Sequence, residues 1–174
     1  MSDTPRAASI SQLMDLDEAG LVGDGPNGFD DQLWLLLTDR VETPEQAAAL
    51  PEPVWVYLAS RWLEWEVGNG GFAQAAYNIP DWFSLAERAY RTLELDAAAD
   101  LIARASKLIA KGDSRGFVAR KLGELFEQFT ESKLAKLDAE LDAAGWWADD
   151  VRVAYVRRKR AAFRGLGEAP ETSG

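Results

Sequence analysis

The fold of this chain is decided between residues 54 and 78, which have the sequence VWVYLASRWLEWEVGNGGFAQAAYN. Large apolar residues recur there at i, i+3, i+7 and i+10, the spacing of one helical face: Trp55, Leu58, Trp62 and Trp65. We therefore expect residues 54–67 to form a helix whose tryptophan face packs into the core. Gly68 is predicted to end this helix, and Asn69 to cap a second short helix.

A carboxylate lies on the same predicted face. With Trp55 at zero on a helical wheel, Glu66 falls at about 20°, beside Trp62. A carboxylate on a core face must be paired, so we expect Glu66 to accept from free backbone N–H groups where the second helix starts. Gly70 and Gly71 leave those amides unobstructed.

The second short helix completes this polar segment. Gln74 and Asn78 lie one turn apart and present their amides on the same side, while Phe72 packs inward. We interpret the segment as a tight corner between two helices held by a buried polar network. The alternative is a small polar pocket or partner-contact site made from residues that include Asn69 and Tyr77.

Turn residues separate further segments with helical periodicity, and no strand ladder stands out. We expect helices over 29–41, 97–111 and 134–145. A further helix should start at a cap by Asn78 and run through Leu93, and the last one should start at Asp149 or Asp150. Another is expected after Ser114, which can cap a stretch that carries Leu122, Leu125, Phe126 and Phe129. We predict an all-α fold, a single irregular bundle of about seven or eight short helices. It should span residues 10–164, with frayed ends at 1–9 and 165–174.

Composition excludes most familiar active sites. The 174 residues include no Cys and no His, so disulfides, thiolate nucleophiles, His- or Cys-ligated metals and Ser-His triads are ruled out. We accordingly assign no catalytic residue, no metal ligand and no cofactor. The chain has no apolar run of the ~20 residues that a membrane helix needs, and no signal-peptide pattern at its start. We expect a cytoplasmic protein.

Charge is distributed unevenly along a chain whose net charge is −10. Residues 1–60 contain eleven acidic and two basic residues, whereas residues 151–174 contain six basic and two acidic ones. An acidic field disfavours nucleic acid and anionic membrane and favours a basic protein surface, although the same acidity is also typical of a merely soluble protein. The candidate partner surface comprises Asp15, Asp17, Glu18, Asp24, Asp30, Asp31, Asp39, Glu42 and Glu45.

Two other features have simple structural interpretations. The basic run from Arg157 to Arg160 is expected in the last turns of a helix, where cations complement the carbonyl end, rather than as a nucleic-acid patch. The adjacent Trp146 and Trp147 cannot both face the same interior. The exposed one is a candidate anchor for a homodimer or a partner interface.

One motif resembles a known family. The pattern E-V-x-N-G-G-F-x-Q-x-x-x-N is made here by Glu66, Val67, Asn69, Gly70, Gly71, Phe72, Gln74 and Asn78. Together with the helices around it and a later Leu137-Asp138, it resembles the domain found in acidic bacterial DNA-mimic proteins, over about residues 50–160. The resemblance implies a compact all-helical protein whose acidic groups occupy the DNA-binding face of a transcription regulator. Ala75 and Ala76 depart from the family's commoner pattern, which has bulkier aromatic residues there.

The predicted function is therefore that of a non-catalytic interaction protein with a basic partner, such as a DNA-binding regulator. A toxin-neutralising immunity protein would use the same electrostatics against a basic nuclease. A small-ligand-binding protein or enzyme that uses the corner of Glu66 and Asn69, with or without a hard divalent cation, remains the alternative from a different class.

Overall fold

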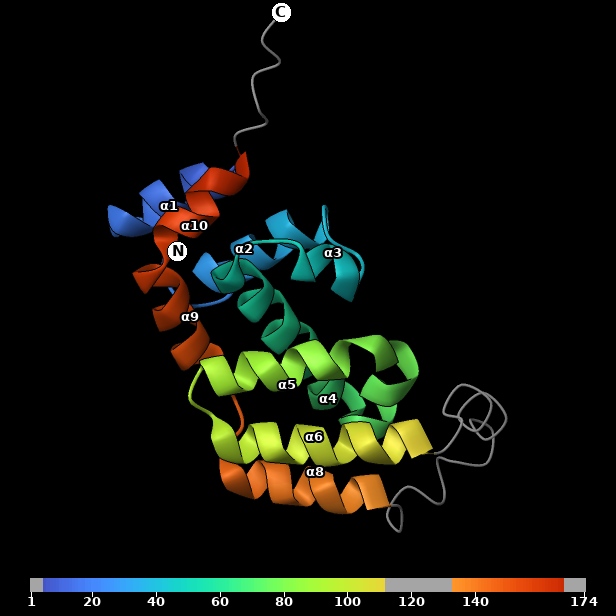
Figure 1. The fold of residues 1–174 in the computed structure, drawn as a ribbon. Coiled ribbons are helices and arrows are strands. Elements are labelled where there is room, and N and C mark those ends of the chain that lie inside the picture. The colour runs from blue at the N-terminus through green and yellow to red at the C-terminus, as the bar shows by residue number, and fades with distance from the viewer. Residues whose placement is uncertain (1–4, 112–132, 168–174) are drawn as a thin grey trace, which may run out of the picture. The chain divides into compact units, whose positions relative to one another are not determined.

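The computed structural model describes residues 5–111 and 133–167, and the regular elements within these residues are all helices, with no strand. In chain order the elements are α1 (Ile10–Glu18), α2 (Phe29–Thr38), α3 (Pro44–Ala48), α4 (Glu52–Asn78), η1 (Pro80–Trp82), α5 (Phe83–Thr92), α6 (Asp96–Lys111), α8 (Lys133–Ala144), α9 (Asp149–Arg158), α10 (Arg160–Arg164) and η3 (Gly165–Gly167) (Figure 1). The predicted all-α class is confirmed. The helix expected after Ser114 lies outside the described residues.

The chain divides into two compact units. One, the terminal unit, combines Met1–Leu58 with Asp149–Gly174, and the other, the central unit, is Ala59–Ala148. The long helix α4 contributes its first residues to the terminal unit and the rest to the central unit. The single domain over residues 10–164 stays a prediction, as do its frayed ends.

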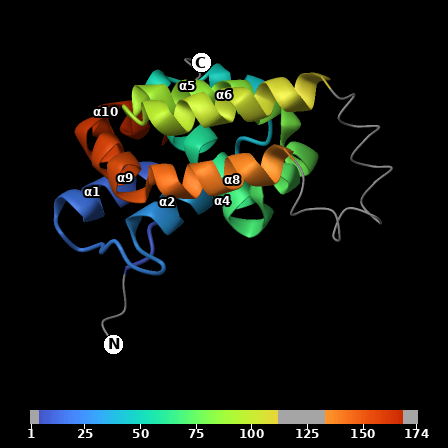
Figure 2. The ribbon, with the colours of Figure 1, turned by 90° about the horizontal axis from the view of Figure 1, so that it is seen from below.

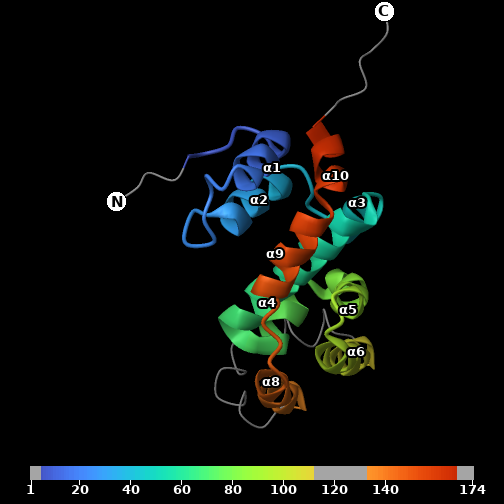
Figure 3. The same ribbon diagram turned by 90° about the vertical axis from the view of Figure 1, so that its left-hand side faces the viewer.

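The terminal unit is built on α1, α2 and α10, which lie side by side (Figure 3). Ser9 caps α1 by accepting from the Gln12 amide at 3.2 Å, and Thr43 and Gln46 form a capping box on α3. The core beneath these helices is apolar and fully buried: Ile10, Leu13, Met14, Phe29, Leu33 and Phe163. Tyr57 packs edge-on against Phe163 with ring centroids 6.3 Å apart.

The central unit contains α5 and α6 as neighbouring helices, with α8 packed on α6 (Figures 1 and 2). Small side chains allow close packing of helices, and several alanines of α5 and α6 are buried: Ala86, Ala89, Ala98, Ala99 and Ala105. The predicted helices over 97–111 and 134–145 are confirmed within one residue at the start of each. Gly145 follows α8 with φ +67°, the left-handed conformation that glycine adopts at a helix end.

The tryptophan face of α4 was predicted correctly only in part. Trp55 and Leu58 are buried, whereas the Trp65 side chain is 51% exposed, with the Arg61 guanidinium 5.9 Å from its ring. In this half of α4 the buried residues are Leu63, Glu64, Glu66 and Val67. Their directions on a helical wheel centre on the side opposite Trp65, so the packing face rotates along the helix.

Helix boundaries account for the other corrections. The first predicted helix ends at Thr38 rather than residue 41. Asn78 is the last residue of α4 and caps no helix, because η1 starts after Ile79 without a side-chain cap. The last predicted helix is divided at Lys159 (φ −111°, ψ 20°), where the chain turns from α9 into α10 (Figure 3).

Candidate functional site

A break in α4 shapes the motif segment. Gly70 (φ −170°, ψ 27°) and Gly71 (φ 72°, ψ −175°) leave the helical conformation, whereas helical structure continues through Asn69. The conformation of Gly71 is essentially restricted to glycine. A Cβ atom there would also lie 2.5 Å from Asp138 Oδ2, so a side chain at this position would displace the Asp138 carboxylate.

Asp138 caps the segment that follows the break. Its Oδ1 accepts from the Phe72 amide at 2.8 Å, so the predicted cap by Asn69 is wrong. Burial raises the pKa of Asp138, and the charge of Asp142 one turn away adds to this, although the Phe72 hydrogen bond opposes the shift. A carboxylate that is costly to ionise thus connects α8 to the start of a helical segment in α4.

Glu66 is the centre of the predicted polar network. It is 7% exposed, and its Oε2 accepts from Asn78 Nδ2 at 2.6 Å and from Gln74 Nε2 at 3.3 Å. The expectation that Gln74 and Asn78 present their amides together is confirmed. The expected donors were backbone N–H groups, however, and the structure supplies side-chain amides instead, because the Phe72 amide is taken by Asp138.

Glu64 is a second buried carboxylate of α4. Its Oε1 accepts from the Ala148 amide at 2.7 Å, and the residue is 1% exposed. Glu64 and Glu66 are two positions apart and bind groups on different parts of the unit, as that spacing on a helix requires. The only sequence signal for Glu64 was a carboxylate within an otherwise apolar helical stretch.

The two adjacent tryptophans have different environments. Trp146 is buried and donates from Nε1 to Asp142 Oδ1 at 3.1 Å, whereas Trp147 is 57% exposed. Their ring centroids are 4.5 Å apart at an interplanar angle of 30°. The expectation that only one of them faces the interior is confirmed, while a homodimer anchored by Trp147 stays a prediction.

A surface pocket of about 650 Å³ adjoins the helix break; we call it the tryptophan pocket. Its lining comprises Val67, Gly68, Asn69, Gly70, Gly71, Gln74, Asp138, Asp142, Trp146 and Trp147. Four residues of the predicted corner therefore line the pocket: Asn69, Gly70, Gly71 and Gln74. Glu66, Phe72 and Asn78 are not part of that lining; Phe72 is buried with its ring centroid 6.1 Å from that of Phe83.

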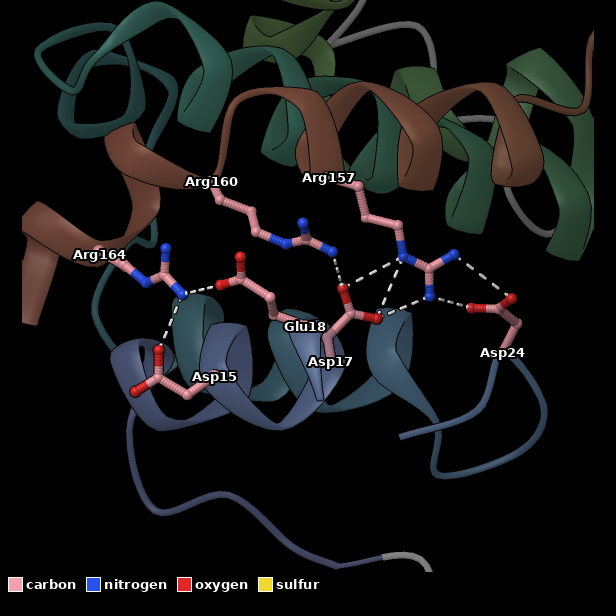
Figure 4. Close-up of polar contacts among 7 residues, drawn as sticks. All are labelled: Asp15, Asp17, Glu18, Asp24, Arg157, Arg160 and Arg164. Atoms are coloured by element: carbon pink, nitrogen blue, oxygen red, sulfur yellow. Dashed lines mark hydrogen bonds and ion pairs between the residues drawn. The ribbon is translucent and has the colours of Figure 1, made fainter. Parts of the chain in front are cut away.

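Four of the predicted surface carboxylates belong to an ion-pair cluster, defined by Asp15, Asp17, Glu18, Asp24, Arg157, Arg160 and Arg164 (Figure 4). Arg157 bridges Asp17 at 2.7 Å and Asp24 at 2.6 Å. Arg160 binds the other oxygen of Asp17 at 2.6 Å. The prediction for the basic run is confirmed for its first half, because Arg157 and Arg158 lie in the last turn of α9. Arg160 instead begins α10, and Arg157 and Arg160 also neutralise carboxylates of α1 and the following loop.

The same cluster continues at α10, where Arg164 binds Asp15 at 2.8 Å and Glu18 at 2.5 Å (Figure 4). Asp17 is 8% exposed. Burial alone raises the pKa of Asp17, but the hydrogen bonds and charges of Arg157 and Arg160 outweigh it and lower the pKa. Asp17 is thus a buried structural carboxylate within the predicted partner surface.

The remaining candidates differ in their surroundings. Asp30 Oδ1 lies 3.6 Å from Nε of the buried Arg152, and Asp31 accepts from the Asn27 amide at 2.9 Å. Asp39, Glu42 and Glu45 are exposed, and no cation of the described chain lies within ion-pair distance of them. These three carboxylates keep their charge toward solvent.

Comparison with known families gives a match for most of the chain. Residues 48–159 match the family of DMP19-like proteins, a stretch that contains the whole motif segment and the tryptophan pocket. This chain belongs to the DMP19-like family. No curated protein and no solved structure matches the chain.

Two kinds of feature are absent from residues 5–111 and 133–167. No helix there is long and apolar enough to cross a membrane. The same residues contain no group of three or more carboxylates placed to hold a metal ion.

Proposed function

We propose that this protein acts as a DNA mimic: it binds the DNA-binding face of a basic protein, such as a transcription regulator, and competes with DNA. Membership of the DMP19-like family carries this proposal, because the motif segment of this chain resembles acidic DNA-mimic proteins and lies within the matched residues 48–159. A net charge of −10 and a pI of about 4.5 agree with it. In this proposal the protein has no catalytic residue and no cofactor.

The distribution of paired charges suggests where the mimicking surface lies. The ion-pair cluster sets four carboxylates against three guanidinium groups, so those carboxylates contribute little outward field. Asp39, Glu42 and Glu45 follow one another between the end of α2 and the first turn of α3, and they keep their charge. We place the mimicking surface on this segment.

Electrostatic competition is the proposed mechanism. Exposed carboxylates steer a lysine- and arginine-rich face toward the protein and occupy the positions that DNA phosphates would take. Association of this kind weakens as salt screens the charges, because the Debye length falls from about 10 Å at 0.1 M to about 3 Å at 1 M.

The test is capture of the partner from a lysate of the source organism with the tagged full-length protein. Washes at about 0.05 M and about 0.5 M salt, and excess duplex DNA as competitor, separate electrostatic partners from others. We expect a basic DNA-binding protein or nuclease that is lost in high salt and displaced by DNA. Capture that resists both salt and DNA would contradict mimicry.

Matched variants localise the surface. The triple change Asp39→Asn, Glu42→Gln and Glu45→Gln removes three charges, and we expect it to weaken partner binding about tenfold at low salt. The control removes the same number of carboxylates from the central unit, where Glu87 and Asp100 are paired with Arg91 and Glu94 is exposed: Glu87→Gln, Glu94→Gln and Asp100→Asn. Equal weakening by both triples would mean that total charge alone matters, and the proposed segment would be wrong.

An immunity protein against a nuclease would bind through the same surface. The identity of the captured protein separates the two functions. A captured nuclease whose DNA cleavage is blocked by this protein indicates neutralisation, whereas a regulator that is released from its operator indicates control of transcription.

A further inference from the structure

The tryptophan pocket has a charge that nothing in the described chain balances. Asp138 and Asp142 lie one turn apart on α8, and both line the pocket. Asp138 accepts from a backbone amide and Asp142 from a neutral indole N–H, and neither has an ion pair within the described residues. The two carboxylates therefore line the pocket without a cation of the described residues to balance them.

The broken helix adds to this negative potential. The first part of α4 ends at the Gly70–Gly71 break, which lines the pocket, and the last carbonyl groups of a helix carry partial negative charge. Gln74 donates its amide N–H to Glu66, which leaves its Oε1 close to Gly70. The polar part of the lining thus consists mainly of hydrogen-bond acceptors.

An exposed aromatic face completes the site. Trp147 lines the pocket and is 57% exposed, and the ring of the buried Trp146 lies beside it with centroids 4.5 Å apart. A Cβ atom at Gly68 would lie 3.1 Å from the Trp147 ring, and one at Gly70 would lie 2.3 Å from Gln74 Oε1. Glycine at these positions keeps the walls of the pocket free of side chains.

An indole face next to two carboxylates is the chemistry that binds an organic cation. A guanidinium group fits best, because it is planar, stacks on aromatic rings and donates several hydrogen bonds to carboxylates. A volume of about 650 Å³ accommodates one long side chain.

We propose that the tryptophan pocket receives an arginine side chain of the basic partner, stacked on Trp147 and bound by Asp142 and Asp138. This inference rests on the proposed function and adds an anchoring site to it. Long-range steering by exposed carboxylates brings the partner close, and the pocket then holds one of its arginines at short range.

The first test uses a small probe and the isotope-labelled full-length protein. N-acetyl-arginine amide is titrated while the indole N–H signals are followed by NMR, with Trp147→Ala assigning the Trp147 signal. We expect a saturable shift of that signal, with a dissociation constant of about 1 mM or weaker. N-acetyl-citrulline amide, which has a similar shape and no charge, should cause no such shift.

Variants decide which groups bind the probe. Asp142→Asn should weaken binding about tenfold, while Trp65→Ala and Glu94→Gln, an exposed tryptophan and an exposed carboxylate outside the pocket, should leave it unchanged. Asp138→Asn serves as a second variant, since asparagine retains an oxygen for the Phe72 amide. No saturable shift at Trp147, an equal shift with citrulline amide, or no effect of Asp142→Asn would overturn the assignment.

The second test separates this inference from the proposed function. Partner capture is repeated with Trp147→Ala against Trp65→Ala, and we expect about tenfold weaker binding only for the former. If a salt-sensitive partner is captured equally by both variants, the pocket assignment is wrong and mimicry stands. If arginine amide binds but no basic partner is captured, mimicry is wrong and the pocket stands.

Discussion

The two units of this protein stabilise buried carboxylates in different ways. In the terminal unit, Asp17 is held by Arg157 and Arg160, which lie about 140 positions later in the sequence. In the central unit, Glu66 and Asp138 are held by neutral N–H donors. The first arrangement pairs a carboxylate with cations, and the second provides no cation.

The difference shows that net charge is a poor guide to an acidic surface. The carboxylates of the ion-pair cluster come from the acidic N-terminal third of the sequence, but arginines near the C-terminus neutralise most of their charge in the fold. The central unit is much closer to balance by composition, yet its tryptophan pocket holds two carboxylates without a cation of the described chain nearby. Function is therefore expected where charge remains unpaired, and four experiments test this contrast.

The largest effect is expected at the helix break. Gly71→Ala forces a side chain into a glycine-specific conformation and against Asp138, so we expect a loss of about 3 kcal/mol in the free energy of unfolding. Urea denaturation measures it. In the background of Asp138→Ala the same change should cost less, and full additivity of the two changes would show that the contact is unimportant.

The next effect concerns the ion-pair cluster. Asp17→Asn leaves two guanidinium groups without their shared carboxylate, and we expect a loss of about 2–3 kcal/mol. The control is Asp15→Asn, whose side chain is 67% exposed and which should lose at most about 1 kcal/mol. Similar losses for both, measured by urea denaturation, would remove the distinction between the buried and the exposed pair.

A smaller loss is expected in the polar corner. Asn78→Ala removes the 2.6 Å hydrogen bond to Glu66 while Gln74 remains, so we expect a loss of about 1–2 kcal/mol. The neighbouring exposed Tyr77→Ala is the control for a change at the end of α4. Thermal unfolding of both variants makes the comparison, and a larger loss for Tyr77→Ala would refute the importance of the Glu66 network.

The finest test is the dependence of stability on pH, because the two carboxylates have opposite shifts. The lowered pKa of Asp17 gives stability that is present above its ordinary value of about 3.9 and is lost as pH falls through the folded-state pKa. The raised pKa of Asp138 gives stability that is present below about 3.9 and is lost as pH rises through its folded-state pKa.

Variants show which carboxylate causes the loss of stability toward low pH and which causes the loss toward high pH. Asp17→Asn should flatten the loss of stability toward acid, and Asp138→Asn should flatten the loss above about pH 4. Urea midpoints between pH 3 and pH 7 provide the measurement. If both changes flattened the same loss of stability, the two sites would not differ as the structure indicates.

The sequence by itself determined the local features of this protein. Helical periodicity predicted the helices over 97–111 and 134–145, because a repeat of 3.6 residues is a property of neighbouring positions. The polar network of Glu66, Gln74 and Asn78 was predictable for the same reason, since all three lie within four turns of one segment. The motif also indicated the family.

Only the tertiary structure decided which distant residues meet. Asp138 is the cap that was predicted to be Asn69, and Arg157 and Arg160 neutralise Asp17. The Trp65 side chain is exposed to solvent. Each outcome depends on how helices that are far apart in the sequence pack together. The spacing of residues along the chain does not tell which of these helices come into contact. This packing decides which carboxylates stay without an ion pair and can bind a partner. Counts of acidic and basic residues do not reveal which ones they are.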